Sequence, residues 1–104
     1  FDQLAPEILK LDASITQEVL KLYIAFKAET NFVDVVPQKS RLRLSLNMPF
    51  HELVDPKGMA KDVTDLGRWG NGDVEVGFSD IAQLPYVMGL IRQAFEKQMD
   101  SAVV

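Results

Sequence analysis

Hydrophobic residues near the N-terminus recur with the spacing of a helix. In "LAPEILKLD" (residues 4–12), Leu4, Ile8 and Leu11 fall on one helical face. Pro6 lies early in this segment, where a missing backbone N–H costs a helix little. The spacing predicts a short helix here.

The next segment, "ASITQEVLKLYIAFKAE" (13–29), predicts a second helix. Ser14 or Thr16 supplies an N-cap, and the helix is expected to end near Leu22 or Tyr23, where the period changes. The apolar stripe of this helix consists of Ile15, Val19 and Leu22.

A third helix is predicted within "SDIAQLPYVMGLIRQAFEKQM" (79–99). Ser79 or Asp80 is suited to the N-cap, and Pro85 is expected to delay the regular part of the helix. Apolar residues repeat at intervals of three and four, which is the pattern of a helix packed on a core. They are Leu84, Val87, Met88, Ile91, Phe95 and Met99.

Four segments between these helices predict β-strands. "YIAFKAE" (23–29), "KSRLRLSLN" (39–47) and "DVEVGFS" (73–79) alternate with the period of a strand. "NFVDVVP" (31–37) is rich in aromatic and β-branched residues and ends at Pro37. One side of the predicted sheet is therefore expected to be core and the other exposed. The inward positions are Ile24, Phe26, Leu42, Leu44, Leu46, Val74, Val76 and Phe78, and the outward ones are Lys39, Arg41, Arg43, Ser45, Asp73 and Glu75.

Two segments without regular periodicity predict connections. "MPFHELVDPKGMAKDVTDLG" (48–67) is interpreted as a long structured connection with one helical turn. The glycines of Gly70-Asn71-Gly72 resemble a phosphate-binding loop, but such a loop precedes a helix and a strand follows here. Asn71-Gly72 is instead typical of a two-residue hairpin turn.

The order of these elements predicts the α+β class. We expect an antiparallel four-stranded sheet packed on one face by the N-terminal and C-terminal helices, with the other face partly open. The length of 104 residues fits one α+β domain over residues 1–104. Because no initiator Met is present, we interpret the chain as a C-terminal fragment of a longer protein.

Composition narrows the chemistry. The chain has no cysteine, so disulfides, thiolate nucleophiles and Cys-ligated metal sites are excluded. No apolar run is long enough to span a bilayer, and the N-terminus lacks the layout of a signal peptide. We expect a cytoplasmic protein that contacts no membrane and holds no cofactor.

The net charge of −4 argues against broad binding to nucleic acid, but the charge is unevenly distributed. Residues 38–69 form the one segment richer in bases than in acids. Six basic residues (Lys39, Arg41, Arg43, Lys57, Lys61, Arg68) stand there against four acidic ones (Glu52, Asp55, Asp62, Asp65).

Alternation places Lys39, Arg41 and Arg43 on one side of a strand, about 6.5–7 Å apart. Three adjacent cations suit a phosphate, a nucleic acid or an acidic protein surface. The alternative is a solvated face, an edge strand protected by charge, or cations neutralised by Asp34 or Glu75 on adjacent strands.

Arg68 and Trp69 precede the glycine-rich turn. Trp69 suits stacking on a base or an apolar anchor, although a single Trp is commonly a part of the core. The predicted binding residues are therefore Lys39, Arg41, Arg43, Arg68 and Trp69.

Catalysis has little support in the sequence. His51 is the one histidine, and its neighbours offer no partner at a recognisable spacing, so we interpret it as a surface or helix-cap residue. Several carboxylates could in principle hold Mg²⁺ or act as acid and base, but they match no known metal-binding spacing, so no metal site is predicted. They are Asp55, Asp62, Asp65, Asp73 and Glu75.

Four segments carry a resemblance to a known family: "NFVDV", "DPKG", "DVTDLGRWGNGDVEV" and "LPYVMGLIRQAFE". The chain resembles, over about nine-tenths of its length, a small prokaryotic domain of unknown function. That domain is found in proteins labelled as predicted transport proteins and at the C-terminus of larger proteins, some with restriction- or nuclease-like N-terminal parts. The resemblance implies a context and supplies no active site.

These observations favour a non-catalytic accessory domain of a larger restriction- or nuclease-like protein. It is expected to bind nucleic acid or a partner protein, such as the N-terminal part of the same protein. One alternative is a dimerisation or assembly module, which would form a homodimer. The other is an enzyme domain that binds a metal or a small ligand.

Overall fold

The computed structural model of the chain describes residues 1–28, 30–63 and 73–103. A short helix, α1 (Leu4–Leu9), and a long helix, α2 (Leu84–Val103), flank the strands. The predicted helices at both ends are thereby confirmed. The elements between them are β1 (Thr16–Val19), β2 (Ile24–Lys27), β3 (Asn31–Pro37), β4 (Leu42–Leu46), the 3-10 turn η1 (Phe50–Glu52), β5 (Ala60–Asp62), β6 (Val74–Phe78) and the 3-10 turn η2 (Ile81–Gln83).

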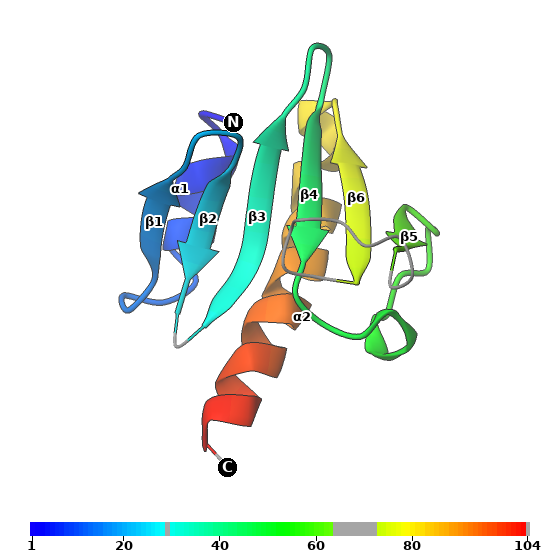
Figure 1. The fold of residues 1–104 in the computed structure, drawn as a ribbon. Coiled ribbons are helices and arrows are strands. Elements are labelled where there is room, and N and C mark those ends of the chain that lie inside the picture. The colour runs from blue at the N-terminus through cyan, green and yellow to red at the C-terminus, as the bar shows by residue number, and fades with distance from the viewer. Residues whose placement is uncertain (29, 64–72, 104) are drawn as a thin grey trace.

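Within the described residues, six strands form one antiparallel sheet in the order β1-β2-β3-β4-β6-β5. Figure 1 shows both helices against the same face of this sheet, so the domain has two layers. The predicted α+β class with an antiparallel sheet is confirmed. The predicted number of four strands is wrong, because β1 and β5 are added at the two edges.

The segment predicted as a second helix contains β1 and a tight turn to β2. The backbone N–H of Leu20 donates to the carbonyl of Tyr23 at 2.9 Å and closes this hairpin. Of the predicted apolar stripe, Ile15 is buried, whereas Val19 and Leu22 are exposed. The apolar spacing therefore does not mark a helical face, and pairing with β2 satisfies the backbone instead.

A β-bulge lies in β3 opposite β2. The register between the two strands shifts by one residue, so Phe32 is an extra residue between the paired Asn31 and Val33. Phe32 and Val33 both join the core despite being neighbours in the strand. The ring of Phe32 meets Phe95 of α2 edge-on, with centroids 5.4 Å apart.

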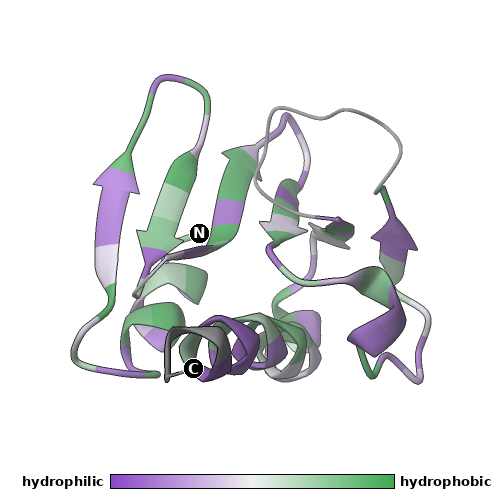
Figure 2. Ribbon diagram, turned by 60° about the horizontal axis from the view of Figure 1, so that its bottom comes forward, coloured by the Kyte–Doolittle hydropathy of each residue, from purple (hydrophilic) through white to green (hydrophobic). Residues whose placement is uncertain are grey.

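The core lies between the helices and the covered face of the sheet. Figure 2 shows hydrophobic segments of the strands and helices facing one another across this layer. Full burial of a large apolar side chain contributes about 1.5–3 kcal/mol, so this layer dominates the stability. The largest fully buried side chains are Phe26, Phe32, Leu4, Ile8, Leu44, Leu46, Leu90, Ile91, Val33, Val35, Val74 and Val76.

Helix α2 is preceded by η2 and a capping box. The carboxylate of Asp80 accepts from the N–H of Ala82 at 3.0 Å, and the side chain of Gln83 accepts from the N–H of Asp80 at 3.3 Å. Pro85 is the second residue of α2, so the predicted cap and the delayed start are confirmed. Over the described residues, neither helix combines the length and apolar character needed to cross a membrane.

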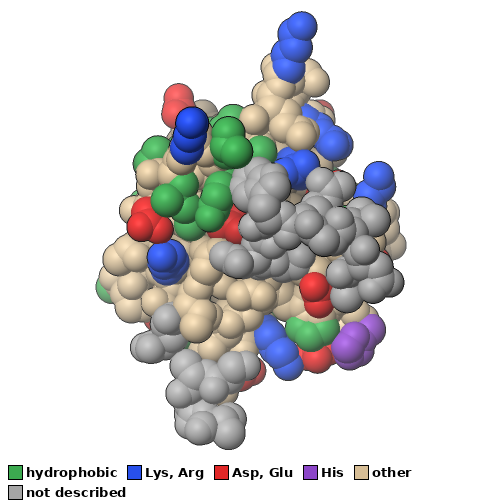
Figure 3. Space-filling model, viewed as in Figure 1, with side chains coloured by type: hydrophobic (Ala, Val, Ile, Leu, Met, Phe, Trp, Pro, Cys, Tyr) green, Lys and Arg blue, Asp and Glu red, His purple; other side chains and the backbone are tan. Residues whose placement is uncertain are grey.

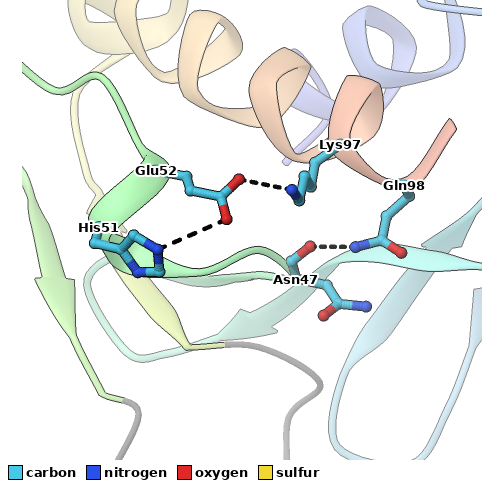
Figure 4. A network of polar contacts seen from close by, with 5 residues as sticks. All are labelled: Asn47, His51, Glu52, Lys97 and Gln98. Atoms are coloured by element: carbon cyan, nitrogen blue, oxygen red, sulfur yellow. Dashed lines mark hydrogen bonds and ion pairs between the residues drawn. The ribbon is translucent and has the colours of Figure 1, made fainter. Parts of the chain in front are cut away.

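Polar contacts tie the connection between β4 and β5 to the C-terminal half of α2 (Figure 4). Lys97 Nζ lies 2.6 Å from Glu52 Oε1, and the amide of Gln98 donates to the backbone carbonyl of Asn47. The hydrogen bond from Lys97 lowers the pKa of Glu52 below its ordinary value. The predicted helical turn in this connection is confirmed as η1, whereas β5 was not predicted.

The same connection is held nearer the middle of α2 by Gln93. Its amide oxygen accepts from the backbone N–H of Val54 at 2.8 Å, and its amide nitrogen donates to the carbonyl of Val54 at 2.8 Å. A side-chain amide that matches both backbone groups of one residue fixes the path of an otherwise irregular chain. Residues 47–54 are therefore held along α2 by side-chain hydrogen bonds and an ion pair.

Candidate interaction surface

The sheet face opposite the helices, called here the open face, carries polar residues at its centre. Asp34, Ser45 and Glu75 lie side by side on β3, β4 and β6, and all three are buried. The side-chain amide of Asn31 donates to Asp34 Oδ1 at 2.7 Å. The expectation that this side of the sheet is exposed is therefore wrong at its centre.

Arg43 lies next to this polar row and meets Glu75. Arg43 Nε is 3.8 Å from Glu75 Oε1, and the two side chains are 17% and 8% exposed. Lys61 of β5 is the Cα partner of Glu75 on its other side. The alternative explanation, that Glu75 neutralises a cation of the neighbouring strand, is confirmed for Arg43.

Lys39 and Arg41 lie in the turn between β3 and β4 and not within β4, which begins at Leu42. The N–H of Gln38 donates to the carbonyl of Arg41 at 2.9 Å and closes the turn. Figure 1 shows this turn projecting beyond the sheet, and Figure 3 shows basic side chains gathered towards it on the open face. The predicted row of three cations on one strand is wrong, because the turn interrupts the alternation before β4.

The side chain of Arg41 lies across Gly77 of β6. A β-carbon at Gly77 would stand 2.5 Å from Arg41 Nη1, which is closer than real contacts allow. Arg41 Nε also donates to the side-chain oxygen of Gln38 at 3.1 Å. Because Gly77 has no side chain, the guanidinium of Arg41 lies directly against β6 there, and the hydrogen bond to Gln38 fixes its orientation.

The β3–β4 turn also borders a cleft of about 400 Å³, called here the end cleft. Its walls come from the turn, the end of β6, the start of η2 and the N-terminal residues of the chain. Phe1 and Ile81 are 37% and 56% exposed, so both offer apolar surface at the cleft. The lining residues are Phe1, Gln3, Gln38, Lys39, Ser40, Arg41, Leu42, Phe78, Ser79, Asp80 and Ile81.

Charge in the end cleft is predominantly positive. Among the described residues that line it, Lys39 and Arg41 are the two bases and Asp80 is the one acid. The carboxylate of Asp80 is engaged in the capping of η2 through the N–H of Ala82. The cleft thus combines an apolar wall with two cations from one turn.

Two of the five predicted binding residues, Arg68 and Trp69, lie outside the described residues. The same is true of Asp65 and of the predicted Asn71-Gly72 hairpin turn. Of the other three, the structure brings Lys39 and Arg41 together at the end cleft and places Arg43 in the ion pair with Glu75.

Asp55, one of the candidate acidic residues, has a structural role. Its carboxylate accepts from the N–H of Met59 at 3.2 Å, from the N–H of Ala60 at 2.8 Å and from the hydroxyl of Tyr86 on α2. Burial by itself raises the pKa of Asp55, but the hydrogen bonds from Tyr86 and these N–H groups outweigh it and lower the pKa below its usual value. Partial burial and the bond to Asp55 raise the pKa of Tyr86.

His51 lies exposed on η1, as the sequence predicts, and its Nε2 is 3.7 Å from Glu52. Asp62 is in β5, and the backbone carbonyl of Asp73 accepts from the N–H of Val63 beside it. Among residues 1–28, 30–63 and 73–103, no three His, Asp or Glu side chains are grouped closely enough to hold a metal ion.

The end cleft includes residues that the sequence interpretation did not single out. Phe1, Ile81 and Gln38 are far apart in the chain, and the fold brings them together. Ile81 could have been identified from the sequence. It is an apolar residue directly after the cap residue Asp80, and it is not part of the apolar stripe of α2. Phe1 and Gln38 carry no comparable signal.

The fold and this surface define the class as a two-layer α+β domain with a cationic, partly apolar cleft at one end of its sheet. The chain belongs to the family described as "Domain of unknown function (DUF5655)", which it matches over residues 1–98. The resemblance to a domain of unknown function is therefore confirmed.

A protein of uncharacterised function from Haemophilus influenzae is similar to this chain. The two are 45% identical over 89 residues, which make up 86% of this chain and 30% of that protein. The chain therefore spans about a third of the length of this relative. No solved structure gives a significant match to the chain.

Proposed function

We propose that this domain is a non-catalytic accessory domain of a longer, restriction- or nuclease-like protein, and that it binds an acidic segment of a partner protein in the end cleft. The observation that carries the proposal is the pairing of Lys39 and Arg41 with the exposed apolar side chains of Phe1 and Ile81 around one cleft. Interfaces between proteins commonly combine an apolar centre with charged groups at the rim.

A protein partner suits this surface better than nucleic acid. Affinity for nucleic acid rests on many phosphate contacts made by Lys and Arg. The described part of the surface offers Lys39 and Arg41 at the cleft, whereas Arg43 is half-buried in the ion pair with Glu75. The net charge of −4 opposes a polyanion as long as DNA, whereas a short acidic segment meets the local charge alone.

The length of the relative supports an accessory role. In the Haemophilus influenzae protein the similar region is 30% of the chain, so this kind of domain occurs there beside a larger remainder. An acidic, partly apolar segment of such a remainder could occupy the end cleft. The restriction- or nuclease-like character of the longer protein is the part of the proposal that rests on the family resemblance.

Fluorescence anisotropy tests the proposal with defined probes. The domain is titrated into a labelled decapeptide of alternating Glu and Leu, its Lys-and-Leu counterpart, and single- and double-stranded DNA 20-mers, each at several salt concentrations. We expect binding of the acidic peptide and a dissociation constant about tenfold higher for the double variant Lys39→Gln/Arg41→Gln, because each lost charge contact is worth about 0.7 kcal/mol.

Lys10→Gln/Arg92→Gln is the matched control, since it removes one Lys and one Arg from exposed positions near another surface hollow. This control should leave the peptide affinity unchanged. Equal losses in both double variants, or no binding of the acidic peptide, would reject the end cleft as the site. Salt-dependent binding of DNA without binding of the peptide would replace the protein partner with nucleic acid.

A further inference from the structure

The two edges of the sheet differ in how they are protected. At one edge, β5 has three residues, two of which are Lys61 and Asp62. At the other, all four residues of β1 are exposed, and β1 contains neither a proline nor a bulge. An edge strand with these properties is open to pairing with another strand.

The hydrogen-bond phase of the β1–β2 hairpin shows which backbone groups of β1 face outward. Leu20 and Tyr23 form a hydrogen-bonded pair at its closed end, with N–H to carbonyl at 2.9 Å. Hydrogen-bonded and non-hydrogen-bonded pairs alternate along an antiparallel ladder. Glu18 therefore bonds to β2, whereas the N–H and C=O groups of Gln17 and Val19 point away from the sheet.

The same edge exposes apolar side chains. Val19 is 73% exposed, and Leu22 is exposed at the tip of the hairpin. A hollow of about 390 Å³ adjoins them and is lined by Val19, Leu20, Lys21, Leu22, Tyr23, Ile24 and Pro37. Neighbouring exposed apolar residues beside outward-facing backbone groups favour a partner that is both extended and apolar.

We propose that β1 pairs antiparallel with β1 of a second copy of this chain and joins the two sheets into one. A two-fold register centred on Glu18 would place the carboxylates of both copies directly opposite each other, which is unfavourable. A register centred on Gln17 requires Ile15 to pair, but its N–H already donates to Asp12 at 3.2 Å and its side chain is buried.

A register centred on Val19 avoids both problems. Val19, the last residue of β1, then pairs with Val19 of the second copy through outward backbone groups. Glu18 lies opposite Leu20, and Gln17 lies opposite Lys21, where the chain leaves β1 and enters the hairpin turn. No like charges face each other across this pairing, and the exposed apolar side chains come together. The edge of β1 is thus complementary to itself in this register, which is the reason for choosing a second copy as the occupant.

Sedimentation equilibrium over a range of concentrations tests the proposal. The unmodified domain should reach a dimer, and Val19→Lys should remain monomeric. The matched control is Val54→Lys, because Val54 is 69% exposed in another part of the chain and should still dimerise. Val19→Pro removes the outward N–H of Val19 and leaves the hydrogen bonds between β1 and β2 in place. This variant should also be monomeric, and an unchanged circular dichroism spectrum shows that it still folds.

Crosslinking tests the register directly, because the chain has no cysteine of its own. Paired residues on antiparallel strands have Cα atoms about 5.5 Å apart, within the range of a disulfide. Val19→Cys should form a covalent dimer under mild oxidation faster than Val54→Cys. A monomer at every concentration, a dimer that persists in Val19→Lys, or equal crosslinking of the two cysteine variants overturns the proposal.

Discussion

Arg43 and Glu75 form a cross-strand ion pair that is longer but far more buried than the pair between Lys27 and Glu18. The Arg43–Glu75 separation is 3.8 Å, against 3.1 Å for Lys27–Glu18, whose side chains are about half exposed. Burial decides which ion pair contributes more to stability. Water screens the charges of an exposed pair, whereas a buried charge depends on its partner for compensation.

We therefore predict that Glu75→Gln lowers the free energy of unfolding by about 3 kcal/mol, since it removes the negative charge that the half-buried Arg43 faces. Glu18→Gln removes the exposed pair as a control and should cost less than about 1 kcal/mol. Urea denaturation at neutral pH measures both. Similar losses for the two variants would show that burial does not set the importance of these pairs.

The hydrogen bond from Tyr86 to Asp55 should make stability depend on pH. The pKa of Asp55 is lowered in the fold, so its contribution is present above the unfolded pKa near 3.8 and is lost as the pH falls through the folded value. Tyr86→Phe removes this hydrogen bond. We predict that the urea midpoint falls at pH 7 and that the difference from the unmodified domain narrows below pH 4.

At alkaline pH the contribution of Tyr86 to stability changes in the opposite direction. The pKa of Tyr86 is raised above its ordinary value of 10.0, so its contribution to stability is complete below that pH and is lost as the pH rises through the folded value.

Asp55→Asn is the control for the acid side. It keeps an acceptor for the tyrosine but cannot titrate, so it should flatten the dependence of stability on acid pH. A constant difference between Tyr86→Phe and the unmodified domain from pH 3 to pH 8 would contradict this account.

Gly77→Ala should weaken binding of the acidic peptide at the end cleft. A methyl group at Gly77 displaces the guanidinium of Arg41, whose nearest nitrogen would be 2.5 Å away. The control is Gly89→Ala on α2, where a β-carbon has no heavy atom of the described residues within 4 Å outside the adjoining residues and backbone of its own helix. It should leave peptide affinity unchanged and stabilise the domain by about 1 kcal/mol. Anisotropy and urea titrations measure the two effects, and equal affinities for both variants would show that the placement of Arg41 does not matter.

Alternation predicted the inward residues of the central strands well, because one face of these strands packs against the helices. Leu44, Leu46, Val74 and Val76 are buried as expected. The segment around β1 was misassigned, because a spacing of four and three residues arises by chance in a short chain and the pattern alone cannot show whether the stripe meets a core. In the fold, Val19 and Leu22 are exposed and do not contribute to the core.

The candidate site could be predicted only in part. Alternation in "KSRLRLSLN" continues smoothly across the turn, so it offers no sign that β4 begins at Leu42 and that Lys39 and Arg41 lie outside it. The neighbourhood of Arg41 and Gly77 depends on the pairing of β4 with β6, which are separated by about 30 residues of chain. Such proximity is a property of strand order and leaves no local pattern.

The bulge at Phe32 gives the start of β3 a contact with α2. The extra residue reverses the inside and outside phase of β3 at its start and so turns an aromatic ring onto Phe95, just past the middle of α2. A strand with uninterrupted phase would present Phe32 to the open face and leave Phe95 without that contact. One additional backbone unit in a strand thereby adds the first residues of β3 to the core between the two layers.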